Sequence, residues 1–182
     1  MELKFRVAAR IAKPVHEVFE AVADPAKLSN YFTTGGAKGR LETGATVEWD
    51  FHDFPGAFPV YVIEVVADEK IVLEWQASEG EAHNVEGSEP KDADYHTRVT
   101  MNFKALDDGR TLVEIAEEGW RENQGALGAS YGNCQGWAQM RCRLALKRAS
   151  RTKRTSSGPS GPASRRWMRN GRVASGNRPP LR

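Results

Sequence analysis

The segment DFHDF places two carboxylates and an imidazole close together, at Asp50, His52 and Asp53. A carboxylate that orients a histidine can make it a general base, because imidazole titrates near neutral pH. On a strand, however, Asp50 and His52 share one face, and Trp49 and Phe51 share the other. The alternation therefore favours a solvated strand face over a catalytic base, and no catalytic residue is assigned.

The adjacent carboxylates Glu117 and Glu118 are the second candidate for chemistry. Neighbouring residues of a strand point to opposite faces, so one of the two is expected to be solvated. The other can reach the interior as a polar anchor for a ligand. We assign that role to Glu117.

The spacing of the histidines and the glycine-rich segment do not support a metal, nucleotide or cofactor site. The histidines are scattered at His16, His52, His83 and His96, whereas a zinc site needs three or four convergent ligands. The glycine-rich TTGGAKG lacks the Lys-Ser/Thr ending of a phosphate-binding loop. We therefore expect no bound metal and no cofactor.

Aromatic residues are dense for one domain, and they supply the candidate ligand-binding surface. Small-molecule pockets are mostly apolar with few polar anchors, although each ring could equally be ordinary core. The candidate lining residues, which accompany Glu117, are Tyr31, Phe32, Trp49, Phe51, Phe58, Trp75, Tyr131, Trp137 and Met140. The segment FHDFPGAFP is expected to form a Pro-Gly turn that acts as a lid.

Hydrophobic periodicity predicts the elements that position these residues. ELKFRVAARI alternates like a strand, and a helix is expected from Pro14 to Asp24, since a residue before proline avoids the α region. A second short helix is expected over residues 26–32. Further strands follow in ATVEWDF, FPVYVIEVVA, KIVLEWQA, YHTRVTMNFKAL and RTLVEIAEEGW. DEK and DDG mark hairpins, and residues 77–94 read as a long, mobile loop.

The last patterned segment, from residue 122 to about 150, is predicted to be one long helix. Its expected apolar side carries Leu127, Tyr131, Cys134, Trp137 with Ala138, and Leu144. The resulting order is strand, one or two helices, six strands and a final helix. Such an arrangement is α+β, with a curved antiparallel sheet of about six or seven strands around a long C-terminal helix.

The chain resembles the SRPBCC (START-like, birch-pollen-allergen-like) helix-grip superfamily, and within it the bacterial group related to the activator of heat-shock-protein-90 ATPase. The resemblance spans roughly residues 1–140 and rests on PVHEVFEAVADPAKLSNYF, GGAKGRLETGATVEWDFHDFPG, IVLEW, and GW with QGWAQM. It implies a deep apolar cavity between sheet and long helix, used for lipids, polyketides and other hydrophobic molecules. It implies no shared catalytic motif.

The chain departs from this family from about Arg141, where an apolar contact is expected under the sheet. Charged groups there must reach water or a partner, so the helix is predicted to fray or bend outward near Arg141.

We expect a START-like helix-grip domain at residues 1–147 and a basic, disordered tail at 148–182. Three interpretations of the tail stay open, namely a frameshifted or otherwise non-native terminus, a solvated tail and a binding arm.

Charge is divided sharply along the chain. Residues 1–146 carry 15 Lys/Arg and 24 Asp/Glu, whereas residues 147–182 carry 11 Lys/Arg and no acid. The tail could bind nucleic acid only non-specifically, through phosphate contacts. No apolar stretch is long enough for a membrane span, and no signal peptide is visible, so a cytoplasmic location is expected.

The leading expectation is a protein that binds a hydrophobic small molecule, lipid-like or polyketide-like, between sheet and C-terminal helix. One alternative is a cyclase- or hydrolase-type enzyme in the same cavity, whose polar group would be Glu117 or Glu118, His52 or His96. Another is a chaperone-interacting protein, by analogy with the ATPase activator, although fold analogy alone is a poor warrant. An interior carboxylate or histidine would favour an enzyme, an enclosed apolar void would favour ligand binding, and a filled core would favour a protein partner.

Overall fold

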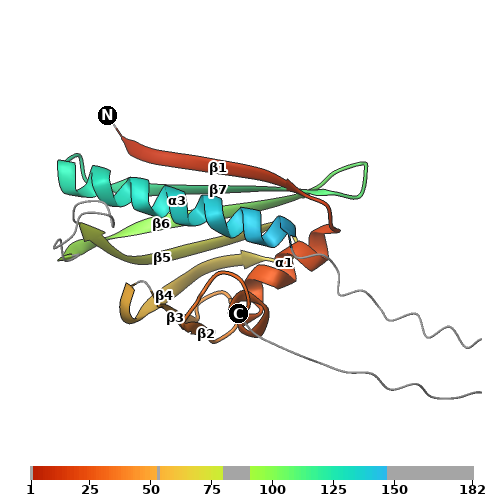
Figure 1. Cartoon of the computed structure of the whole chain (residues 1–182), viewed down its shortest axis with the longest axis horizontal. Helices are drawn as coiled ribbons and strands as arrows, with labels where there is room; N and C mark the ends of the chain where they lie inside the picture. The colour runs from red at the N-terminus through yellow and green to blue at the C-terminus, as the bar shows by residue number, and fades with distance from the viewer. Residues whose placement is uncertain (1, 53, 80–90, 147–182) are drawn as a thin grey trace, which may run out of the picture. The chain divides into compact units, whose positions relative to one another are not determined.

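A seven-stranded antiparallel sheet curves around a long C-terminal helix (Figure 1). The structure is a computed structural model that describes residues 2–52, 54–79 and 91–146. Its elements are β1 (Leu3–Ile11), α1 (Val15–Ala23), α2 (Pro25–Leu28), β2 (Gly36–Lys38), β3 (Thr46–Phe51), β4 (Phe54–Val66), β5 (Lys70–Glu79), β6 (Lys91–Ala105), β7 (Thr111–Trp120) and α3 (Gln124–Leu146). The strand order is β1-β7-β6-β5-β4-β3-β2, which confirms the predicted α+β helix-grip fold.

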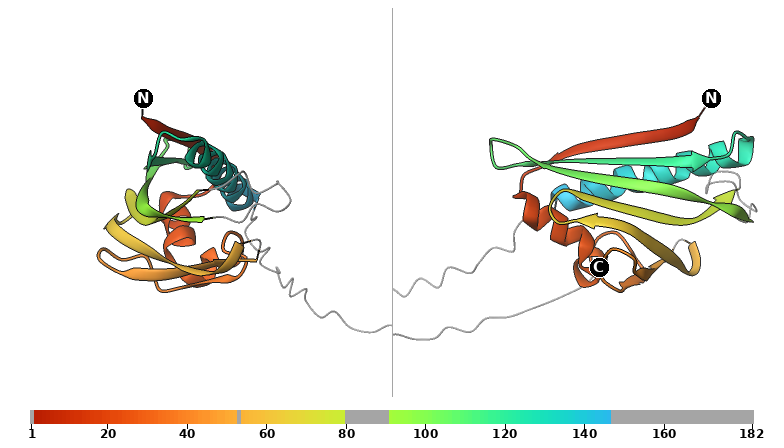
Figure 2. Two further views of the ribbon diagram at one scale, coloured as in Figure 1. Left: turned by 90° about the vertical axis from the view of Figure 1, so that its left-hand side faces the viewer. Right: turned by 180° about the vertical axis from the view of Figure 1, so that it is seen from behind.

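The two longer helices share the concave face of the sheet. Seen end-on, the sheet bends into an open wall, and α1 and α3 lie on its inner side (left view of Figure 2). All of these elements belong to one unit, Met1–Ala149. The core lies between the inner face of the sheet and the two helices.

The strand β6 shows how sequence alternation creates the inner face. Its residues Thr97, Val99, Met101 and Phe103 are buried, while the intervening side chains are exposed or half-buried. Both predicted hairpins form, with β4 pairing to β5 and β6 pairing to β7. In the second hairpin, Gly109 takes a positive φ of 76° that glycine adopts without strain.

Helix α1 forms where a helix was predicted and buries an apolar stripe that includes Val18, Phe19 and Val22. Asp24 then caps α2, because its Oδ1 accepts hydrogen bonds from the backbone N–H groups of Ala26 (2.9 Å) and Lys27 (3.4 Å). The second short helix therefore exists, but it ends at Leu28 and does not reach Tyr31 and Phe32.

Helix α3 buries Trp137 and Leu144 as predicted, but in its first half the buried side is displaced by one residue from the predicted one. Its buried side chains are Ala126, Ser130, Trp137, Met140 and Leu144. With Asn133, which reaches an interior hydrogen bond, these positions repeat at steps of four and three residues. Leu127 and Cys134 are only half-buried, and Tyr131 is 65% exposed. Small and polar residues form the buried stripe in the first half of the helix, whereas larger apolar residues lie outside it.

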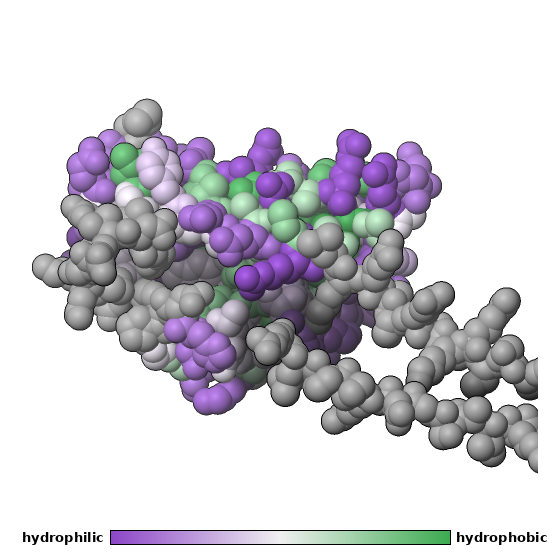
Figure 3. Space-filling view, viewed as in Figure 1, coloured by the Kyte–Doolittle hydropathy of each residue, from purple (hydrophilic) through white to green (hydrophobic). Residues whose placement is uncertain are grey.

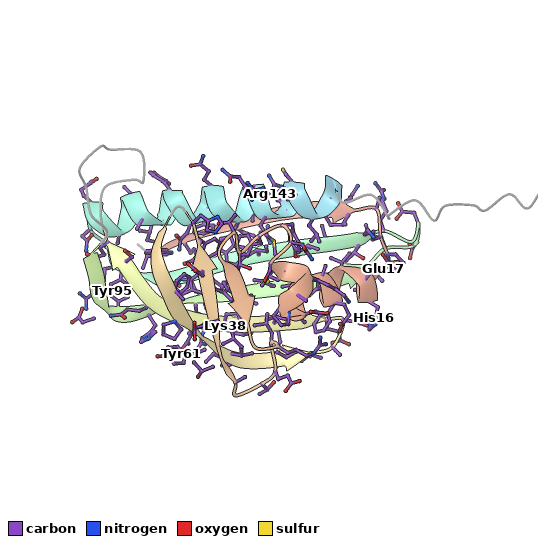
Figure 4. The ribbon with its side chains drawn as sticks, turned by 60° about the horizontal axis from the view of Figure 1, so that its bottom comes forward. His16, Glu17, Lys38, Tyr61, Tyr95 and Arg143 are labelled. Carbon is purple, nitrogen blue, oxygen red and sulfur yellow. The ribbon has the colours of Figure 1, made fainter. Side chains whose placement is uncertain are left out.

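The prediction that the last helix frays near Arg141 is wrong, because α3 continues to Leu146 and buries Leu144. The arginines find backbone acceptors instead. The Nη1 atom of Arg141 donates to the carbonyl of Ala8, and that of Arg143 donates to the carbonyl of Tyr31 at 3.3 Å. Figure 4 shows Arg143 near the C-terminal end of α3. These bonds give each guanidinium group a backbone acceptor without moving the helix, although the buried Nε atom of Arg141 has no hydrogen-bond partner among the described residues.

The expected Pro-Gly lid is also absent from the described residues, because β4 begins at Phe54 and runs through that segment. The β3–β4 register shifts there, with Trp49 opposite Phe58 and Phe51 opposite Phe54. Gly56, at a φ of +87°, absorbs the resulting bulge. The segment is therefore part of the sheet wall.

Several predictions fall outside the described residues. They concern residues 80–90 and the tail from residue 147, including its disorder and its three interpretations. The two ends of the expected loop 77–94 are wrong, because residues 77–79 belong to β5 and residues 91–94 to β6. The domain boundary at residue 147 stays a prediction as well.

Candidate functional site

A buried carboxylate lies in the core between the sheet and α3. The side chain of Glu117 has an exposed fraction of 0%. Its Oε1 accepts hydrogen bonds from Thr97 Oγ1 and Asn133 Nδ2, and its Oε2 accepts one from Trp137 Nε1, each at 2.9 Å. We call these four residues the Glu117 network. Among the described residues, no cationic side chain forms an ion pair with this carboxylate.

The position of Glu117 follows from strand alternation and from a bulge. Val113, Ile115 and Glu117 occupy the inward positions of β7, so the carboxylate continues an apolar row. Beyond it the register with β1 shifts, with Phe5 opposite Glu117 and Leu3 opposite Trp120. Gly119 provides the left-handed conformation at the bulge, with a φ of +89°. As a result, Trp120 also points into the interior.

The environment of Glu117 favours its neutral form despite three donors. Burial raises the pKa of the Glu117 carboxyl to about 7, and this desolvation outweighs the hydrogen bonds from Asn133, Trp137 and Thr97, which lower the pKa. A carboxyl group that titrates near neutral pH can hold or release a proton under ordinary conditions. When the Glu117 carboxylate is charged, its hydrogen-bond donors among the described residues are the uncharged side chains of Thr97, Asn133 and Trp137.

Aromatic rings cover the side of the network that carries Trp137. The Trp137 ring stacks on Phe32 at 5.1 Å and on Trp75 at 5.7 Å between centroids. Trp49 meets the Trp137 ring at 6.4 Å, and Phe32 meets Phe51 edge-on at 5.2 Å. Phe51 in turn stacks on Phe58 at 6.1 Å. We call the six rings of Phe32, Trp49, Phe51, Phe58, Trp75 and Trp137 the aromatic cluster.

The structure thus brings together seven of the ten predicted site residues, namely Glu117 and the aromatic cluster. Met140 lies in the same core and is 1% exposed. Tyr31 is buried too, but its hydroxyl donates to the Ala21 carbonyl at 3.0 Å, and burial raises its pKa. Tyr131 does not join the cluster, because the buried stripe of α3 faces another way. Figure 3 shows apolar surface along the region of β1 and α3.

The other candidates for chemistry lie away from the interior. His52 is exposed, and its backbone N–H donates to Thr34 Oγ1 at 2.9 Å. His96 is exposed and contacts the ring of Tyr61, which Figure 4 shows on the face of the sheet turned away from α3. Asp53 is outside the described residues. Glu118 is half-buried.

Thr97 and Asn133 are network residues that sequence reasoning did not single out. The signal for Thr97 was present, since it alternates with Val99 and Met101 on the inner face of β6. The signal for Asn133 lies in spacing, because counting back from Leu144 and Met140 in steps of four and three reaches it. Hydrophobicity alone pointed to the neighbouring positions Leu127, Tyr131 and Cys134.

A comparison with protein-family models matches residues 12–146 to the Activator of Hsp90 ATPase homolog 1-like protein family. The chain belongs to this family. The match covers the whole network and the whole aromatic cluster, and it confirms the predicted SRPBCC, START-like superfamily. No curated protein matches the chain significantly.

Solved structures support the same fold. MLL2253 from Mesorhizobium loti is 17% identical, with a TM-score of 0.61, over 79% of this chain and 94% of that one. BH1534 from Bacillus halodurans is 22% identical, with a TM-score of 0.58, over 79% and 96%. DynU16, a putative protein in the dynemicin biosynthetic locus, is 22% identical with a TM-score of 0.60 over 78% of this chain. This chain spans only 45% of the DynU16 chain, and at these identities the likeness shows the fold alone.

Two further findings concern the described residues only. None of their helices combines the length and hydropathy needed to cross a bilayer. Their His, Cys, Asp and Glu side chains form no cluster of three or more that could hold a metal ion.

Proposed function

We propose that this chain binds an apolar small molecule between its sheet and α3, with Glu117 as the polar anchor. The observation that carries the proposal is the fully buried carboxylate beside the aromatic cluster. Burying an ionisable group costs stability unless it is fully paired, and Glu117 has no countercharge among its described partners. Costly interior groups of this kind concentrate at functional sites.

The small side chains beyond the network support a position for the ligand. Ala77 and Ala126 pack with Trp120 in a second buried cluster, separate from the main core. Ser130, which is 3% exposed, precedes Asn133 by three residues on the inner side of α3. We call the surroundings of Ala77, Ala126 and Ser130 the small-residue region. Glu117 lies on β7 between the large core residue Ile115 and this small-residue region. A ligand placed there would touch the carboxylate without displacing the stacked rings.

Native mass spectrometry of the intact purified chain tests this proposal. We expect an added mass in the range of a small lipid or polyketide, which is lost on denaturation. The variant Ser130→Phe places a ring in the small-residue region and should abolish the added mass. The matched control Gln135→Phe adds the same ring at an exposed position of α3 and should retain the added mass.

A chain without added mass, both as purified and after incubation with apolar extracts, would contradict binding. Added mass that persists in folded Ser130→Phe would contradict the assigned region. Circular dichroism melting of both variants establishes that they are folded.

An enzyme of cyclase or hydrolase type is the second candidate, and Glu117 is the observation that favours it. A carboxyl group with a pKa of about 7 can exchange protons with a bound molecule at neutral pH. His52 and His96 are exposed, so the enzyme reading now depends on this one group. The chaperone-interacting alternative rests on the family name alone.

A further inference from the structure

We propose that the polar group recognised by the Glu117 network is a hydroxyl, so that the ligand is a neutral, apolar alcohol or phenol. This inference rests on the proposed function and names the chemical class of ligand. It follows from the unused acceptor position of Glu117 and from two buried indole donors. Three further buried atoms without a partner among the described residues, Thr33 Oγ1, Ser78 Oγ and Arg141 Nε, are not used in this inference.

The carboxylate retains one unused acceptor position. An ionised carboxylate offers about four lone-pair sites on its two oxygens. Thr97 and Asn133 occupy two of them on Oε1, while Trp137 occupies one on Oε2. The remaining site on Oε2 calls for a donor from the ligand.

Unpaired donors lie in the same interior. The indole Nε1 atoms of Trp49 and Trp120 are buried and have no hydrogen-bond partner among the described residues. Trp49 contacts the Trp137 ring that donates to Glu117, and Trp120 follows Glu117 by three residues on β7. A buried indole N–H without a partner destabilises the fold, so an acceptor from a ligand would be favourable.

A hydroxyl meets both requirements with a single uncharged atom. It donates its proton to Oε2 of Glu117 and accepts from an indole N–H through its lone pairs. An ether accepts from the indole but donates nothing to the carboxylate. A ligand carboxylate accepts as well, but it repels the charge of Glu117. An ammonium group donates but leaves the indole N–H groups unpaired.

Three probes with one ring system test this inference by isothermal titration calorimetry at pH 8, where Glu117 is mostly ionised. They are 2-naphthol, 2-methoxynaphthalene and 2-naphthoate, each added to the full chain. We expect 2-naphthol to bind about tenfold or more tightly than the ether, because hydrogen bonds to a charged group are the strong ones. The anion 2-naphthoate should bind weakest.

The variant Glu117→Gln should bind 2-naphthol and the ether with about equal affinity, because an amide nitrogen replaces one acceptor oxygen. Tyr131→Ala, on the exposed side of α3, should keep the wild-type preference. Equal binding of 2-naphthol and the ether by the wild type would overturn the hydroxyl inference and leave the proposed function standing. Binding of none of the three probes would overturn both.

Discussion

Replacing Trp137 with alanine is expected to lower the free energy of unfolding by about 3–5 kcal/mol, the range for truncating a buried aromatic side chain. Trp137 is 3% exposed, and its ring stacks on those of Phe32 and Trp75. The substitution also removes one of three donors to Glu117 and leaves the carboxylate less well paired. Urea-induced unfolding followed by circular dichroism measures the change.

Two variants separate packing from hydrogen bonding at this position. Trp137→Phe keeps a ring in the stack but removes the N–H donor, and it should cost about 1–3 kcal/mol. Tyr131→Ala truncates an aromatic residue on the same helix but on its exposed side, and it should change stability by less than about 0.5 kcal/mol. Equal effects of Trp137→Ala and Tyr131→Ala would contradict the orientation of α3.

Stability should depend on pH through Glu117, and the sign is opposite to that of a salt-bridged carboxylate. Its pKa is raised from 4.5 to about 7 in the folded chain, so the folded state binds this proton more tightly than the unfolded state. Between those two pH values the unfolded chain binds fewer protons, and the free energy of unfolding therefore falls as pH rises. The total loss is about 3 kcal/mol, at about 1.4 kcal/mol for each pKa unit.

The variant Glu117→Gln isolates this contribution, because the other titrating groups are present in both proteins. Glu17, Glu20 and Asp108, for instance, have lowered pKa values through Lys13, Arg40 and Arg110, and they act in the opposite direction at acid pH. Measured by urea unfolding from pH 4 to pH 8, the variant should gain about 3 kcal/mol relative to the wild type as pH rises. A difference that stays constant over this range would show that Glu117 does not titrate as assigned.

Much of the fold could be predicted because the local patterns are strong. The alternation in β6 and β7, the DDG hairpin and the apolar stripe of α1 each specify their element without help from the rest of the chain. The same alternation predicted that one of Glu117 and Glu118 would point inward, since only one of two adjacent strand residues can do so.

The inward side of α3 could be predicted from hydrophobicity at Trp137 and Leu144 but not in the first half of the helix, which does not bury its largest apolar residues. Leu127 and Tyr131 lie outside, while Ala126, Ser130 and Asn133 face the sheet. The tertiary need to pair a buried carboxylate and to pack near Trp120 overrides the local pattern. The arginines near the end of α3 were misjudged because their acceptors, the Ala8 and Tyr31 carbonyls, come from distant parts of the chain.

Nuclear magnetic resonance of the indole groups can show whether Glu117 and its donors form the polar end of a ligand site. The chain has five tryptophans, and the Nε1–H signals of a ¹⁵N-labelled sample can be assigned with Trp→Phe variants. Titration with 2-naphthol at pH 8 should shift the Trp137 signal saturably, together with that of Trp49 or Trp120, and Glu117→Gln should abolish these shifts. If the Trp137 signal stays in place up to the solubility limit of 2-naphthol, Glu117 does not anchor the ligand.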